Sequence, residues 1–117
     1  MALKFEELRV WQKAIDITVH VHNLTLTFPK EERYILTSQM KRAADSIALN
    51  IAEGSTGQSD AEQNRFLGYS IRSAIEVICC LHIGQRRNII NQTDFDYLYE
   101  ELQTLLKSLH TFRKAIK

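Results

Sequence analysis

The sequence is poor in residues that interrupt regular structure and in residues that cross-link small proteins. Of its 117 residues, one is proline, four are glycine and two are cysteine. So little proline and glycine excludes a loop-rich or low-complexity chain. The cysteines, Cys79 and Cys80, are adjacent, which excludes a disulfide framework, so we expect inert thiols in a reducing compartment.

The chain also lacks a dominant charge and a long apolar run. Fifteen Lys and Arg residues face fourteen Asp and Glu residues, for a formal net charge of +1. No global field therefore attracts the protein to nucleic acid or to an anionic membrane, and any such binding must come from local patches. The apolar runs are far shorter than the roughly 20 residues of a membrane helix, and the charged first residues do not form a signal core. We predict one cytoplasmic domain, residues 1–117, with no membrane contact.

Apolar residues recur with the 3.6-residue period of a helix, which predicts an all-α, antiparallel, up-down four-helix bundle. The predicted helices span about 6–27, 32–53, 59–88 and 93–116. Pro29 ends the first helix because its ring cannot continue the hydrogen-bond ladder, and Gly54 suits a left-handed position after the second. Ser59 and Glu62 match a capping box for the third helix, and Thr93 is the expected cap of the fourth.

Two predicted helices carry more apolar surface than one buried face needs, whereas a single stripe suffices for the fourth. These residues are Leu8, Val10, Trp11, Ala14, Ile15, Ile17, Val21, Leu24 and Leu26 in the first helix and Phe66, Leu67, Ile71, Ala74, Val77, Ile78 and Cys80 in the third. We expect a homo-oligomer, because a contiguous exposed apolar patch usually marks an interface. Coverage by the N-terminal arm and the chain ends is the alternative.

A polar stripe follows the second predicted helix. It consists of Gln39, Arg42, Ser46, Asn50 and Glu53, at spacings of three and four residues. The stripe either lines a binding groove, in which Arg42 holds a carboxylate or phosphate, or forms a packing network between helices or subunits. The network is favoured, since buried polar groups normally find hydrogen-bond partners.

No residues have the spacing of an established catalytic or metal site. No glutamate is followed by a histidine three residues later, as a di-iron bundle requires. Cys79 and His82 share a helix face but supply only two ligands, and no second pair follows. Phosphate-binding glycine loops and a nucleophile elbow are also missing. We therefore expect no catalytic residues, no metal and no cofactor.

Basic clusters with aromatic residues elsewhere leave nucleic-acid binding open. The clusters are Lys41 with Arg42, Arg86 with Arg87, and the tail Arg113, Lys114 and Lys117; the candidate stacking groups are Trp11, Tyr34, Tyr69, Tyr97 and Tyr99. In an up-down bundle the second cluster shares one end with Lys30 and Arg33, and the tail lies at the other end. Acidic residues accompany both ends, and a symmetric oligomer would repeat each cluster in a ring.

Several ordered motifs are shared with a bacterial family. They are Phe5–Ala14, Phe28-Pro29 with Glu32, Ser38–Ile47, Asn50–Gly54 and Arg65-Phe66-Leu67. Over residues 5 to about 80 the chain resembles the four-helix-bundle family named after proteins encoded in intervening sequences of large-subunit ribosomal RNA genes. The resemblance implies antiparallel helices assembled as a homopentamer. It also implies a relationship to the accessory protein of diversity-generating retroelements, a basic pentamer that binds nucleic acid and works with a reverse transcriptase.

Two hypotheses of function follow. The first is a non-enzymatic homo-oligomeric bundle that binds RNA, or a nucleic-acid-handling protein partner, through repeated basic patches; Arg42, Arg86 and Arg87 are the positions to test. The second is a protein-interaction scaffold with no nucleic-acid role, which the near-neutral charge favours.

Overall fold

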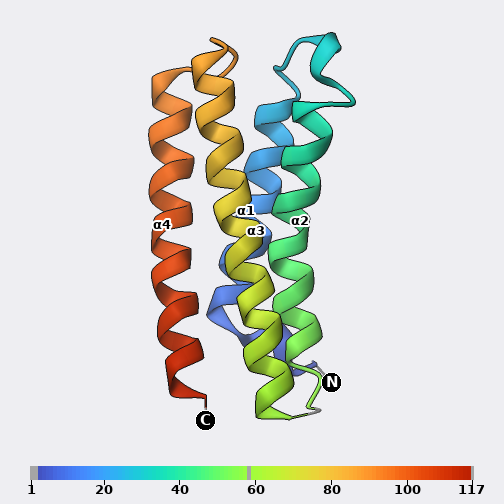
Figure 1. The fold of residues 1–117 in the computed structure, drawn as a ribbon, viewed down its shortest axis with the longest axis vertical. Helices are drawn as coiled ribbons and strands as arrows, with labels where there is room; N and C mark the ends of the chain where they lie inside the picture. Colours follow the sequence, from blue (N-terminus) through green and yellow to red (C-terminus); the bar gives the residue numbers. More distant parts are fainter. Residues whose placement is uncertain (1–2, 58, 117) are drawn as a thin grey trace.

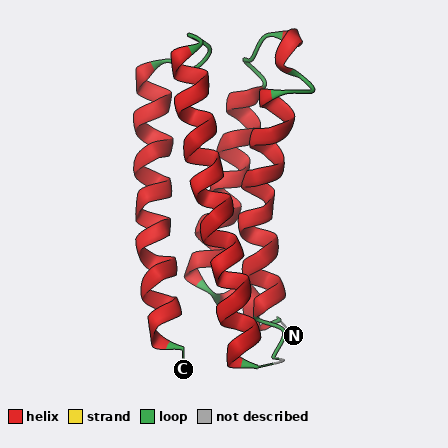
Figure 2. Cartoon of the chain, viewed as in Figure 1, coloured by secondary structure: helices red, strands yellow, loops and turns green. Residues whose placement is uncertain are grey.

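A computed structural model describes residues 3–57 and 59–116, and their regular structure is helical throughout. The helices are α1 (Arg9–Thr25), α2 (Leu36–Gly54), α3 (Asp60–Arg86) and α4 (Gln92–Ala115), with short 3-10 turns η1 (Lys4–Glu7) and η2 (Lys30–Glu32). The helices run alternately up and down (Figure 1), and Figure 2 shows that loops occur only at the ends of the helices. The predicted all-α four-helix bundle is confirmed.

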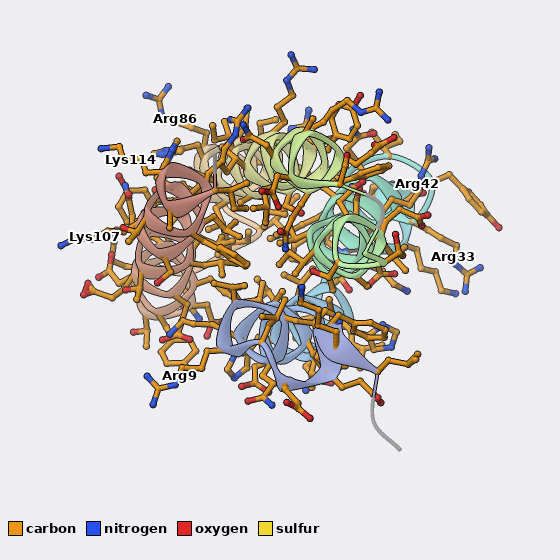
Figure 3. All side chains as sticks on the ribbon, turned by 90° about the horizontal axis from the view of Figure 1, so that it is seen from below. Arg9, Arg33, Arg42, Arg86, Lys107 and Lys114 are labelled. Carbon is orange, nitrogen blue, oxygen red and sulfur yellow. The ribbon has the colours of Figure 1, made fainter. Side chains whose placement is uncertain are left out.

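Seen along the bundle axis, the four helices stand at the corners of a square (Figure 3). The bundle extends 43 × 24 × 21 Å along its principal axes. Each helix packs against its neighbour in sequence, and α1 also packs against α4. We call the end that holds the α1–α2 and α3–α4 connections the upper end, and the end that holds the α2–α3 loop the lower end (Figure 1). The apolar stripe of α2 lies in the core: Leu36, Met40, Ala43, Ile47 and Ile51 are all buried.

Two helices begin later than the periodicity predicted. Residues ahead of α1 form η1, and Leu8 is extended, with φ −77° and ψ 128°, so the α-helix starts only at Arg9. Ahead of α2, the Glu32 amide donates to the Pro29 carbonyl at 3.0 Å, which makes a 3-10 turn. Ile35 is then non-helical, with φ −120° and ψ −99°, and α2 begins at Leu36. Local turns thus replace the first helical residues at both places.

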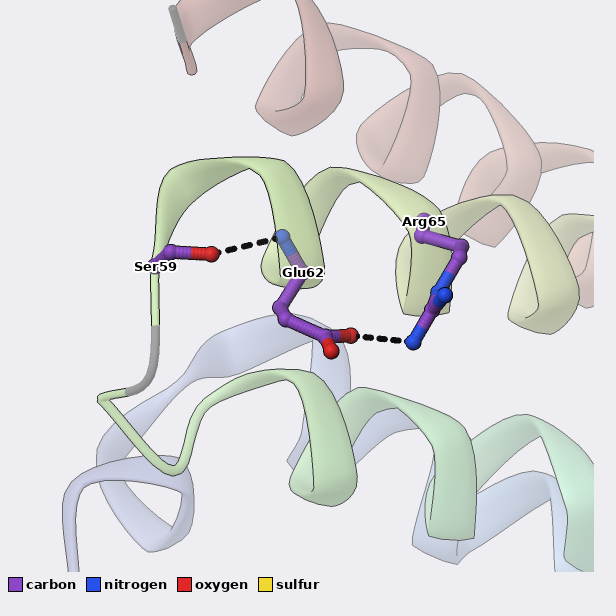
Figure 4. A network of polar contacts seen from close by, with 3 residues as sticks. All are labelled: Ser59, Glu62 and Arg65. Atoms are coloured by element: carbon purple, nitrogen blue, oxygen red, sulfur yellow. Dashed lines mark hydrogen bonds and ion pairs between the residues drawn. The ribbon is translucent and has the colours of Figure 1, made fainter.

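The Ser59 half of the predicted capping box is confirmed, and the predicted cap of α4 is wrong. The Ser59 hydroxyl accepts from the Glu62 amide at 3.1 Å, while the Glu62 carboxylate accepts from Arg65 (Figure 4). The cap of α4 is Asn91, whose side chain accepts from the Asp94 amide at 2.8 Å, and Thr93 lies inside the helix. The tight turn after α3 explains this correction.

That turn reverses the chain within a few residues. Asn88 takes a left-handed conformation with φ 60°, and the amides of Ile89 and Ile90 both donate to the Gly84 carbonyl, at 2.8 and 3.1 Å. Ile90 is buried against α3. Helix α4 can therefore begin directly after this turn, and Asn91 is in position to cap it.

Gly54 has a different role from the predicted one. It is the last residue of α2, and the glycine with positive φ in the described chain is Gly57, at 89°. A Cβ on Gly54 would lie 2.8 Å from Cβ of Phe66. Gly54 is therefore required where α2 and α3 approach each other closely at the lower end.

The wide apolar faces are used mostly within the chain. Of the residues predicted to exceed the core of α1 and α3, Leu26 is exposed, and the others are buried or half-buried. The intrachain core therefore accounts for these faces, and self-association stays a prediction. Outside that predicted set, Val19, Leu49 and Ile75 are also exposed.

Helix α3 is long and apolar enough to cross a membrane by length and composition, with a mean hydropathy of 1.4 over 18 residues. In the bundle, 44% of that window is buried inside the protein. The core helix of a water-exposed bundle meets the same criterion, so this feature is weak evidence for a membrane span.

Candidate nucleic-acid interface

The predicted basic residues occupy separate places on the bundle. Seen from below (Figure 3), Arg33 and Arg42 project from one side, and Arg86, Lys107 and Lys114 project from the opposite side. Lys117, which belongs to the predicted basic tail, lies outside the described residues. The three clusters are therefore best considered one at a time.

Lys41 and Arg42 line a hollow at the upper end, between the end of α1, the connection after it and the first turns of α2. We call this the basic hollow; its volume is about 560 Å³. Its lining consists of Lys30, Arg33, Lys41 and Arg42, one carboxylate, Asp45, the hydroxyl residues Thr25, Thr37 and Ser38, and Leu26, Phe28, Pro29 and Tyr34. Four cations thus face one anion in a chain whose net charge is only +1.

The local sequence explains how this hollow forms. Phe28 is buried and anchors the chain to the core, and Pro29 then starts η2, which carries Lys30. Arg33 and Tyr34 follow in the turn before α2. Because Lys41 is the sixth residue of α2, it lies less than two turns from that connection. Two segments that are separate in the sequence therefore present their cations to one space.

The four cations of the basic hollow have no carboxylate partner among residues 3–57 and 59–116. The ion pairs found there are Lys13 with Glu101, Arg65 with Glu62, and Arg87 with Glu32. The Arg33 guanidinium lies instead 5.9 Å from the centroid of the Tyr34 ring. No side chain caps the N-terminus of α2, which borders the hollow. All these features favour an anion in this space.

Arg86 and Arg87 are adjacent in sequence but differ in their partners. Arg87 forms an ion pair with Glu32 at 3.2 Å, which ties the end of α3 to η2. Arg86 is exposed, and both arginines line a separate hollow of about 450 Å³ with Cys79, His82 and Ile83. The predicted pair therefore contributes one cation that is free among the described residues.

The basic tail of α4 is also divided. The Arg113 Nε donates to the Asn64 side chain of α3, and its guanidinium packs on Gly68, where a Cβ would lie 3.1 Å from Nη2. Gly68 thus leaves room for Arg113 to join α4 to α3. Lys114 is exposed. Arg113 consequently has a packing contact that the sequence did not indicate.

The polar stripe of α2 splits into two parts. Gln39 donates to Glu76 of α3, the Ser73 hydroxyl donates to Ser46 Oγ at 3.1 Å, and Asn50 donates to Ser46 Oγ at 3.0 Å. Arg42 and Glu53 are exposed. Three of the five residues therefore make hydrogen bonds on the α2–α3 side, in two separate groups, and Arg42 belongs to the basic hollow.

The sequence analysis did not identify Ser70, a fully buried polar side chain between α2 and α3. The Ser70 hydroxyl is fully buried and donates to the Ile47 carbonyl at 2.9 Å. The signal was the pair Ser70 and Ser73, three residues apart and hence on one face of α3. The sequence analysis placed Lys30 and Arg33 at the correct end of the bundle. It did not predict that they share a hollow with Lys41 and Arg42.

The thiols and histidines do not form a reactive or metal-binding group in the part of the chain that the structure describes. No three His, Cys, Asp or Glu side chains there lie close enough together to hold a metal ion. Burial, with smaller contributions from Glu76 and Cys79, raises the pKa of the Cys80 thiol to about 11. Cys80 is therefore protonated at neutral pH and a poor nucleophile.

Comparison with known proteins agrees with this bundle. A solved structure of a protein of unknown function from the S23 ribosomal protein family of Bacteroides thetaiotaomicron superposes with a TM-score of 0.84. It is 24% identical, and the match covers 90% of this chain and 98% of that one, which establishes the shared fold. No curated protein is significantly similar to the chain. Neither this neighbour nor the family of 23S rRNA-intervening sequence proteins is described as an enzyme. A sequence model of the 23S rRNA-intervening sequence proteins matches residues 6–111, and the chain belongs to that family.

Proposed function

We propose that this protein is a non-enzymatic, cytoplasmic RNA-binding bundle, and that the basic hollow is its contact surface for RNA phosphates. The observation that carries the proposal is the gathering of Lys30, Arg33, Lys41 and Arg42 around one space with no carboxylate partner among the described residues. Phosphate contacts by such cations release counterions, which supplies most of the affinity of a protein for nucleic acid. The description of the family, 23S rRNA-intervening sequence proteins, names RNA and no other polyanion, and on that ground we take RNA as the ligand.

Self-association would raise the affinity for RNA without requiring any binding residue outside the basic hollow. A homo-oligomer, which we propose to be a pentamer, repeats the hollow once in each subunit, and linked sites bind one RNA with higher avidity than a single site does. Size-exclusion chromatography with light scattering tests the assembly. A monomer at all concentrations would remove avidity from the proposal and leave the single hollow as its basis.

The direct test is a titration of fluorescein-labelled, 20-nucleotide RNA, followed by anisotropy between 50 and 200 mM salt. We expect affinity to fall linearly with the logarithm of salt concentration, and the double variant Lys41→Ala, Arg42→Ala to weaken binding and flatten the salt slope by roughly 1 to 2 units. The matched control is Lys107→Ala, Lys114→Ala, which removes two exposed cations from α4. Equal loss in both variants, or no loss in the first, would refute the basic hollow as the RNA site.

A protein-interaction scaffold is the second candidate, and it has its own observation. Leu26 and Ile35 are 73% and 61% exposed at the upper end, where a protein partner would cover them. A pull-down from nuclease-treated lysate distinguishes the two functions. A stoichiometric protein partner that is retained after nuclease treatment and lost on Leu26→Asp supports the scaffold; the absence of one counts against it.

A further inference from the structure

Tyr34 is the most exposed large hydrophobic side chain of the described residues. Its exposed fraction is 84%, although tyrosine normally buries much of its ring. The other tyrosines all contact an aromatic ring: Tyr69 meets Phe66, Tyr97 meets His20, and Tyr99 stacks on Phe95. Among residues 3–57 and 59–116, the Tyr34 ring has no aromatic partner, and the neighbouring Arg33 guanidinium lies 5.9 Å from its centroid. One face of a rigid, flat ring is therefore available beside the basic hollow.

The surroundings of Tyr34 combine two chemistries at short range. Leu26, Pro29 and Tyr34 are the exposed apolar members of the lining, and Phe28 is buried. The remainder holds four cations, three hydroxyl residues and one carboxylate, that of Asp45. A nucleotide has the same division, because a flat apolar base is joined through ribose to an anionic phosphate. Aromatic rings interleaved with cations are the usual means of holding single-stranded nucleic acid.

From this arrangement we infer that the basic hollow binds unpaired nucleotides of single-stranded RNA, with phosphates on the cations and a base stacked on Tyr34. The inference rests on the proposed function and names its substrate class. Single strands are favoured over duplex because the bases of a duplex are already stacked inside it and cannot reach Tyr34.

The dimensions of the site agree with this choice. The hollow of about 560 Å³ is in the range of small-ligand pockets, roughly 300 to 1,000 Å³, and so matches one or two nucleotides. Folds that recognise duplex RNA contact about 16 base pairs along two minor grooves. The bundle is 43 Å long, and the four cations line a single hollow at the α1–α2 connection. A duplex would therefore touch the site only through its backbone.

The experiment compares three tyrosine variants and the double variant Lys41→Ala, Arg42→Ala. The three RNA probes are a 20-nucleotide single strand, the same sequence as a duplex, and an abasic ribose-phosphate strand of equal length. We expect Tyr34→Ala to weaken single-strand binding by about 5- to 150-fold, the loss of one stacked base, and to leave binding of the other two probes unchanged. Tyr34→Phe keeps the ring and should bind within about twofold of the original chain. Tyr97→Ala, which truncates another exposed tyrosine, is the control for a general loss of aromatic surface.

Each result decides one of the two statements. If Tyr34→Ala weakens all three probes equally, or none of them, the stacking inference is wrong. The proposed function then still stands as long as the Lys41→Ala, Arg42→Ala variant loses binding to the single strand and duplex alike. If that double variant binds every probe as the original chain does, the proposed function itself fails.

Discussion

At the lower end of the bundle, Arg113 donates to Asn64 and packs on Gly68, and Arg65 forms an ion pair with Glu62. At the upper end, by contrast, the cations of the basic hollow face one another with no carboxylate partner among the described residues. Arg113, and Arg87 with Glu32 at the upper end, thus join separate elements of the bundle. The four cations of the basic hollow stay unpaired among the described residues. An arginine whose donors are already used by the protein has little to offer a phosphate, so position in the sequence alone is a poor guide to function.

Charge reversal in the basic hollow tests this difference most strongly. The double variant Lys41→Glu, Arg42→Glu should lower affinity for labelled RNA at 50 mM salt by about 100-fold, because two attractive charges become repulsive. Its unfolding temperature, followed by circular dichroism, should change by no more than about 2 °C, since neither Lys41 nor Arg42 is buried in the original chain. The matched control Lys107→Glu, Lys114→Glu carries the same net charge. If it loses RNA affinity equally, total charge governs binding and the two ends do not differ in function.

A methyl group at the lower end should affect stability and not binding. Gly54→Ala places a Cβ 2.8 Å from Cβ of Phe66 and 3.4 Å from Cα of Gln63, so α2 and α3 must separate. We expect the free energy of unfolding to fall by about 1 to 3 kcal/mol, although alanine favours a helix, and RNA affinity to be unchanged.

Urea unfolding monitored by Trp11 fluorescence measures this change. The control is Gly57→Asn: Gly57 has open space around it, and its φ of 89° lies in the left-handed region that asparagine tolerates better than other residues. A Gly54→Ala variant as stable as the original chain would show that the close approach of α2 and α3 does not contribute to stability.

Arg113→Ala should separate the packing role of that side chain from its predicted role in RNA binding. Loss of the hydrogen bond to Asn64 is expected to cost about 1 kcal/mol, which lowers the unfolding temperature by about 4 to 8 °C for a domain of this size. RNA affinity should change by less than about twofold. Lys114→Ala, on the neighbouring exposed residue, should leave the unfolding temperature unchanged. A large loss of RNA binding in Arg113→Ala would show that the basic tail of α4 contacts RNA.

The smallest expected effect is a gain. Asp45 is the one carboxylate in the lining of the basic hollow, where it repels a phosphate. Asp45→Asn should therefore raise RNA affinity by about two- to fivefold at low salt, and the gain should shrink as salt screens the charges. Glu53→Gln, on the same helix but outside that lining, provides the control. Weaker binding by Asp45→Asn would mean that Asp45 orients a cation or contacts the RNA itself.

Local patterns in the sequence predicted most of the fold. The helical period of apolar residues gave four helices and the buried stripe of α2, and a serine with a glutamate three residues later located the start of α3. These features depend on residues within about four positions of each other, where side chains and backbone amides must meet whatever the rest of the chain does. The start of α2 and the cap of α4 differ from the prediction because a 3-10 turn follows Pro29 and the left-handed Asn88 reverses the chain before α4.

The sequence predicted only half of the candidate site. Lys41 and Arg42 stood out as neighbours, but only the folded connection between α1 and α2 brings Lys30 and Arg33 to the same hollow. Tertiary structure likewise decided that Arg87 pairs with Glu32, 55 residues away, and that Arg113 is held by Asn64, 49 residues away. Composition and periodicity determine which residues are polar and which face they occupy. Whether a charged side chain meets a partner or solvent depends on which distant helix lies opposite, and that is decided by the packing of the whole bundle.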